Sequence, residues 1–175
     1  DLGSKASLLS FELSKIDSNA KYINALGQDL YLLSSETYRA VYRIGSDELK
    51  SWRSTGKLKA KKITVDSKAT KNTWFFYSDQ SLKYSNYMIL YYFDSNDKAH
   101  YCAMKYEKNK NRLKEYYTST NSIGVSSNGT VSEIEYMADK KKFKVKLSDN
   151  TGKMIKTFNY KTPAKAESLF AIPFC

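Results

Sequence analysis

The stretch NYMILYYF, residues 86–93, decides how the fold is read from the sequence. Read as a strand, it places Tyr87, Ile89, Tyr91 and Phe93 on one face and Met88, Leu90 and Tyr92 on the other, so both faces are apolar. A strand of this kind is buried on both sides. We therefore expect structure on each side of it, with the N-terminal part of the chain as one candidate cover.

Segments with a period of two surround this stretch from about residue 36 onward. They are TYRAVYRI (37–44), KLKAKKITVD (57–66), TWFFYSD (73–79), KAHYCAMKYE (98–107), RLKEYYTS (112–119), VSEIEYMA (131–138), KKFKVKLS (141–148) and MIKTFNYK (154–161). The connections between most of them are short and polar, as in hairpins, whereas parallel pairing needs long crossovers. The pattern predicts a mainly β fold, an antiparallel meander or barrel of about eight strands.

The two ends of the chain show a helical pattern and not the period of two seen between them. Between residues 6 and 33, apolar residues recur at steps of three and four, as on one stripe of a helix. Thr162 and Pro163 suit the start of a short C-terminal helical turn. We expect a single domain, 1–175, in which a helical segment, 1–33, packs on the β region, 36–161, followed by a tail, 162–175.

The charge of the chain points to an anionic partner. The formal net charge is +11, and lysine supplies most of the cations. In residues 142–147, lysines alternate with Phe143, Val145 and Leu147, which predicts one wet and one dry face. We expect a polyanion or partner to bind Lys140, Lys141, Lys142, Lys144 and Lys146. Sequence-specific nucleic-acid recognition is not expected, because lysine reads base edges less well than arginine.

Aromatic residues suggest a second kind of site. The chain has 15 Tyr, 8 Phe and 2 Trp. A closed core favours aliphatic side chains, whereas tyrosines that face inward suit a cavity for an amphipathic ligand. We expect such a ligand site around Trp74, Phe76, Tyr91, Phe93, Tyr136 and Phe143. The sequence leaves open which tyrosines face a cavity and which face the surface.

His100 and Cys102 could be a reactive pair, but they lie two residues apart within one expected strand. A strand interior is a poor place for an exposed nucleophile, and one histidine with two cysteines falls short of a structural zinc set. We expect no catalytic residues, no metal and no cofactor. Glu133 and Glu135 share a face and are expected to meet solvent opposite lysines.

The two cysteines favour a Cys102–Cys175 disulfide, with two free buried thiols as the alternative. Asn128 begins the sequon Asn-Gly-Thr in a polar loop, which suits glycosylation. No apolar run reaches the length of a membrane span. Together these features predict a secreted or extracellular protein.

The chain resembles secreted lipocalins of the arthropod salivary type. The resemblance rests on LYLLSSETYRAVYRI (30–44) as a first strand, YMILYYFDSNDKAHYCAMKY (87–106) as a central hairpin, and the final Cys175. It implies a cavity for small host mediators or lipids, or a surface that binds a host protein, and it assigns no individual binding residue.

These features predict a secreted, non-enzymatic binding protein that sequesters a small amphipathic ligand in an aromatic-lined cavity. The alternative is a basic module that binds a protein or a polyanion through its lysine-rich strands, such as an adhesin, effector or immune modulator. Expected partners are a small ligand or a host protein, with an anionic glycan or a membrane surface as further candidates.

Overall fold

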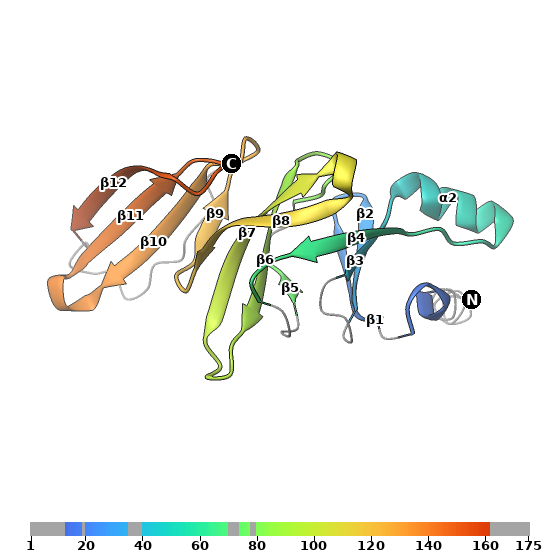
Figure 1. Ribbon diagram of the computed structural model, residues 1–175, viewed down its shortest axis with the longest axis horizontal. Coiled ribbons are helices and arrows are strands. Elements are labelled where there is room, and N and C mark those ends of the chain that lie inside the picture. Colours follow the sequence, from blue (N-terminus) through green and yellow to red (C-terminus); the bar gives the residue numbers. More distant parts are fainter. Residues whose placement is uncertain (1–12, 19, 35–39, 70–73, 78–79, 162–175) are drawn as a thin grey trace.

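The computed structural model describes residues 13–18, 20–34, 40–69, 74–77 and 80–161, and over these ranges the chain is mainly β (Figure 1), which confirms the predicted fold class. Eight strands form one sheet in the order β1-β2-β3-β4-β8-β7-β6-β5. Their bounds are β1 Ala20–Leu26, β2 Asp29–Ser34, β3 Ala40–Ile44, β4 Lys61–Asp66, β5 Phe75–Phe76, β6 Tyr87–Phe93, β7 Ala99–Glu107 and β8 Arg112–Ser119.

The eight-stranded sheet is nearly closed. Strands β1 and β5 lie at the two ends of the strand order, yet the rings of Tyr22 and Phe75 are 5.1 Å apart across them. The pairing is antiparallel except between β4 and β8, where Thr64 and Val65 pair with Arg112 and Leu113 in parallel. This corrects the expectation of a purely antiparallel sheet. The long crossover that a parallel pair needs is present, but it consists of the strands β5 to β7 and not of a helix.

Four further strands form a second, antiparallel sheet in the order β12-β11-β10-β9, which we call the C-terminal sheet. Its strands are β9 Ile123–Val125, β10 Val131–Met137, β11 Lys142–Ser148 and β12 Met154–Lys161. In Figure 1 it extends beyond the eight-stranded sheet, with β9 nearest to that sheet and β12 at the outer edge.

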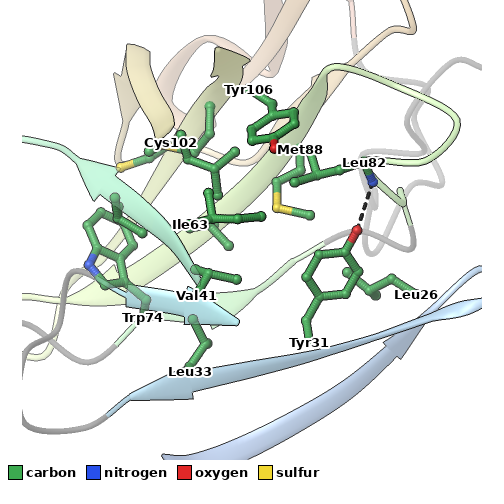
Figure 2. Packing of buried hydrophobic residues seen from close by; sticks show 14 residues of the cluster. Leu26, Tyr31, Leu33, Val41, Ile63, Trp74, Leu82, Met88, Cys102 and Tyr106 are labelled. Carbon is green, nitrogen blue, oxygen red and sulfur yellow. Dashed lines mark hydrogen bonds between the residues drawn. The ribbon is translucent and has the colours of Figure 1, made fainter. Parts of the chain in front are cut away.

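The main hydrophobic core lies inside the eight-stranded sheet, between β2–β4 on one side and β6–β8 on the other (Figure 2). Val41 and Ile63 face Met88 and Leu113 there. Tyr31 also packs in this core. Its hydroxyl oxygen accepts a hydrogen bond of 2.9 Å from the backbone N–H of Leu82.

A second hydrophobic cluster joins the two sheets. Tyr87 and Ile89, on the outer face of β6, pack with Ile123, Val125 and Val131 of the C-terminal sheet. On the other face of β6, Met88 and Leu90 belong to the main core. The prediction of cover on both sides is therefore confirmed for Tyr87 to Leu90, with strands and not a helix as the covers, whereas Phe93 at the end of the strand is 47% exposed.

The N-terminal segment differs from the expected helix. Residues 13–16 are helical, but residues 20–34 form the β1–β2 hairpin. Gly27, at φ 59°, opens the two-residue turn between the strands, and pairing with β3 completes the backbone hydrogen bonds of β2. Ile23, which the helical stripe would bury, is half exposed. The predicted C-terminal turn at Thr162 lies outside the described residues.

Two elements have no counterpart in the sequence-based prediction. Helix α2 (Ser46–Thr55) begins with Asp47 and Glu48 in its first turn, where carboxylates favour the helix dipole. It ends at Gly56, whose φ is 69° and whose N–H donates to the carbonyl of Trp52. The three-residue strand β9 is too short to show a period of its own.

Two kinds of hairpin turn recur through β6–β12. Five-residue turns at 94–98, 126–130 and 149–153 are closed by an Asp or Ser oxygen that accepts backbone N–H groups within the turn. Short 3-10 turns, Lys108–Lys110 and Ala138–Lys140, join β7 to β8 and β10 to β11, and each is followed by a residue at positive φ. The hairpins β7–β8 and β10–β11 are therefore built alike, although their surroundings differ.

Candidate functional site

The six aromatic residues predicted to line one ligand cavity lie at three separate places. Trp74 and Phe76 belong to the main core, and Trp74, which is 2% exposed, packs edge-on against Tyr92. Tyr136 and Phe143 form a directly opposed pair on the C-terminal sheet. The structure thus does not gather these residues around a shared cavity.

Tyr91 and Phe93 belong to a third place, a group of partly exposed rings that we call the aromatic surface. Its rings stand 4.8 to 6.2 Å from their neighbours and come from β1, β5, β6, β7 and the residue after β5. The members are Tyr22, Phe75, Tyr77, Tyr91, Phe93 and Tyr101. It continues the outer face of β6 beyond the part that the C-terminal sheet covers.

The strand register confirms that lysines and apolar residues of β11 lie on opposite faces, but the predicted dry face is not dry, because Phe143, Val145 and Leu147 are only partly buried. Lys142, Lys144 and Lys146 lie on the face that also carries Glu133 and Glu135, which we call the lysine face. Lys146 is neutralised within the sheet, because its Nζ is 2.9 Å from Oε1 of Glu133 and 3.2 Å from Oε2 of Glu135. Of the five predicted lysines, Lys146 is therefore a structural ion-pair partner.

Glu133 corrects a sequence-based expectation, because it lies opposite Lys146 as predicted but is only 4% exposed. Its carboxylate accepts hydrogen bonds from the hydroxyl of Tyr117, from Nδ2 of Asn121 at 2.8 Å and from Lys146. Burial by itself raises the pKa of Glu133, but these three donors outweigh it and the pKa lies below the usual glutamate value. The Glu133 carboxylate therefore connects β8 and the loop after it to the C-terminal sheet.

The remaining predicted lysines gather at the other end of the lysine face. Lys142 lies directly opposite Lys161 of β12, and Lys144, two pairs further along, is the next residue of β11 on the same face. Lys140 and Lys141 extend the group into the exposed 3-10 turn. We call these five residues the C-terminal lysine cluster: Lys140, Lys141, Lys142, Lys144 and Lys161.

The cluster has few counter-charges. Among the carboxylates whose side chains the structure describes, which do not include Asp139, none has an oxygen within 4.0 Å of the ammonium groups of the cluster, and Glu135, opposite Lys144, is paired with Lys146. Like charges directly opposite each other on two strands destabilise a sheet. Lys161 was not predicted as a site residue, since only the β11–β12 register brings it to Lys142.

His100 and Cys102 do not form a reactive pair. His100 places Nε2 2.8 Å from Oδ2 of Asp94 and stacks on Tyr92 at 4.9 Å. Cys102 is a free, buried thiol of the main core, and burial raises its pKa to about 12. Cys175 lies outside the described residues, so the predicted disulfide stays a prediction.

Asn128 is exposed in the turn 126–130, as a sequon requires, and its Oδ1 accepts a hydrogen bond from the hydroxyl of Ser126. Its glycosylation stays a prediction. In the described part of the chain, no group of three or more His, Cys, Asp or Glu side chains could hold a metal ion. Over the same ranges no helix is long and apolar enough to cross a membrane.

No family model matches the chain, and no curated protein sequence does. Among solved structures, a candidate 6-phosphogluconolactonase from Bacteroides fragilis matches with a TM-score of 0.35 and 13% sequence identity. The match covers 82% of this chain and 39% of that one, so the chain spans about two fifths of the length of the protein it matches.

This finding overturns the sequence-based prediction that the protein is not an enzyme, because the matching structure is described as an enzyme; that prediction is withdrawn. The likeness is too distant to assign that protein's fold or activity to this chain. None of these comparisons tests the lipocalin resemblance, which stays a prediction.

Proposed function

We propose that the protein binds polyanions through the C-terminal lysine cluster. The observation that carries this proposal is the direct opposition of Lys142 and Lys161, with no carboxylate near either ammonium group among the side chains that the structure describes. A sheet gains nothing from this arrangement, whereas a sulfate or phosphate group between two such lysines neutralises both. The net charge of +11 adds long-range attraction for the same class of partner.

Heparin is the probe for this proposal. We expect the triple variant Lys141→Gln, Lys142→Gln and Lys161→Gln to bind heparin about tenfold or more weakly at 0.15 M salt, since each lysine removed also removes an ion-pair contact. The dependence of affinity on salt should become shallower in the same variant. Isothermal titration at several salt concentrations measures both effects.

The matched control carries the same loss of charge elsewhere, at the exposed Lys57, Lys59 and Lys68. We expect its heparin affinity to stay within about twofold of the unmodified protein. Equal weakening by the two triple variants would mean that only net charge attracts heparin, and the cluster would then not be a site.

A second candidate function is binding of a small amphipathic ligand at the aromatic surface, which the contacts of Phe75 with Tyr91 and Phe93 support. A neutral probe such as N-phenyl-1-naphthylamine should bind there with little dependence on salt, because the contact is apolar. The variant Tyr91→Ser with Phe93→Ser should lose the fluorescence gain of the probe. An unchanged gain would remove this candidate.

An extracellular location is part of the proposal, supported by the exposed sequon at Asn128 and by the cysteine pair. Mass spectrometry of the protein from its natural source tests it. A glycan on Asn128, or a mass deficit of about 2 Da from a bond between Cys102 and Cys175, would support it. An unmodified chain with two thiols would count against it.

A further inference from the structure

We infer that the face of the C-terminal sheet opposite the lysine face is a stacking platform for single-stranded nucleic acid. This inference rests on the proposed polyanion binding and names a class of polyanion for it. We call this surface the platform. It consists of Ile134, Tyr136, Phe143, Val145, Leu147, Lys156, Phe158 and Tyr160, which the register of β10, β11 and β12 places on one face.

Aromatic rings cross the platform in an ordered way. Tyr136, Phe143 and Tyr160 face one another across three neighbouring strands, as one row. Phe158 lies in the next row, opposite Val145. The rings of Tyr136 and Phe143 stack at 4.9 Å, and those of Phe158 and Tyr160 stack at 6.3 Å.

The platform is exposed, whereas the corresponding face of the β7–β8 hairpin is covered by other strands. Tyr106, opposite Leu113 in the similarly built β7–β8 hairpin, is 8% exposed because β2–β4 cover it. Tyr136, opposite Phe143, is 54% exposed, and so is Tyr160. The hairpin itself therefore does not require exposed rings, and their exposure on the platform suits a ligand.

The charge of the platform selects an anionic ligand. Its register positions carry no carboxylate, and its one charged residue, Lys156, holds Nζ 4.8 Å from the centre of the Phe158 ring. Lys142 and Lys161 point to the opposite face from Phe143 and Tyr160. The cations available to a ligand on the platform are therefore Lys156 itself and the turn residues Lys140 and Lys141, which lie at the end of the sheet nearest the row of three rings. Phosphates can meet these lysines while bases meet the rings.

The combination of open rings and bordering lysines fits unpaired bases better than the other polyanions. Single-stranded nucleic acids bind proteins by stacking bases on aromatic side chains while cations follow the phosphates. Sulfated glycans use the lysines without needing flat aromatic surfaces. Because stacking works for every base, this mode of binding needs no sequence recognition, in keeping with the lysine-rich composition.

Fluorescence anisotropy with a labelled oligothymidylate of about 20 nucleotides tests the inference. In the variant Tyr136→Ala with Tyr160→Ala, we expect the affinity for the oligonucleotide to fall at least tenfold. Heparin affinity should stay within twofold, because the lysine cluster is intact. The control Tyr84→Ala removes a tyrosine that is 62% exposed and lies against Gly27 of the β1–β2 turn, outside the C-terminal sheet, and should change neither affinity.

The outcomes separate this inference from the proposed function. If the protein binds heparin but the tyrosine variant keeps its full affinity for the oligonucleotide, the platform is not a stacking site and polyanion binding survives. If the unmodified protein binds neither probe, the proposed function fails as well. Polyglutamate that binds as tightly as the oligonucleotide, with the same loss in the tyrosine variant, would identify an acidic protein partner and overturn the inference.

Discussion

Single side chains in this protein take roles that residue type alone does not reveal. Glu133 and Glu135 are two residues apart on one face, yet Glu133 is buried with three donors while Glu135 is partly exposed. The difference arises because Tyr117 and Asn121 come from β8 and the loop after it to enclose one of the two carboxylates. Sequence spacing gives the shared face but not this enclosure.

Glu133 should make stability depend on pH. A carboxyl group whose pKa is lowered by folding stabilises the protein above its unfolded pKa of about 4.3, and this contribution disappears as the pH falls through the lower folded value. We expect Glu133→Gln to cost about 1 to 3 kcal/mol at pH 7 and progressively less as the solution is acidified below pH 4. Urea unfolding across this pH range measures the difference, with the exposed Glu48→Gln as control. A constant difference from pH 7 to pH 3 would contradict the role of the charge.

Cys102 should be chemically inert in the folded state. Its buried thiol, with a pKa of about 12, supplies almost no thiolate near pH 8, and thiolate is the form that reacts. In the variant Cys175→Ser, which leaves a single cysteine, we expect a disulfide reagent to react only after denaturant is added. Complete reaction of the native protein within the mixing time would show that the thiol is accessible.

At the scale of elements, two glycines with positive φ, Gly152 and Gly56, close a turn of the C-terminal sheet and the end of helix α2. Gly152 closes the β11–β12 turn at φ 86°, and a Cβ there would run into the carbonyl oxygen of Tyr116. Gly56 also has a positive φ, at 69°, but faces open space. These two glycines separate the effect of backbone conformation from that of close packing.

We expect Gly152→Ala to destabilise the protein by about 2 kcal/mol or more, because backbone strain and a clash add together. Gly56→Ala should cost only about 1 kcal/mol, since it adds strain alone. Thermal unfolding of the two variants gives the comparison. Equal losses would mean that the turn shifts to accommodate the added methyl group.

Most strands could be predicted from their sequence, and the helix α2 and the N-terminal hairpin could not. Alternation identified β6, β7, β10, β11 and β12, because most residues on at least one face of each strand are apolar or aromatic. Residues 20–34 carry a helical spacing of apolar side chains as well. Tertiary pairing with β3 overrides that local signal, since it satisfies the backbone of β2.

At the scale of the whole molecule, β6 links the two hydrophobic clusters through consecutive residues. Leu90 points into the main core and Ile89 toward the C-terminal sheet. We expect Ile89→Ala to raise hydrogen exchange chiefly in β9 and β10, and Leu90→Ala to raise it chiefly in β3 and β4. Each should also lower the free energy of unfolding by about 2 to 5 kcal/mol. Identical exchange patterns in the two variants would show that the clusters open together.

Only part of the candidate site could be predicted from the sequence. The lysines of β11 and the pairing of Tyr136 with Phe143 follow from alternation and a hairpin. Three features depend on strand register and on how the two sheets meet. Lys146 pairs with Glu133, Lys161 lies opposite Lys142, and Tyr91 lies apart from Tyr136. These are long-range contacts, for which local patterns carry no information.

The parallel pair between β4 and β8 has a consequence for how the chain is made. During synthesis, β4 leaves the ribosome well before Arg112 and Leu113 have been added, and these residues are its partners on one edge. Until then the edge of β4 presents unpaired amides to any neighbouring chain, and such edges promote aggregation. Lys61 and Lys62, both exposed, lie just before the stretch 64–66 that later pairs with β8, and charged side chains beside an open edge disfavour its pairing with other chains.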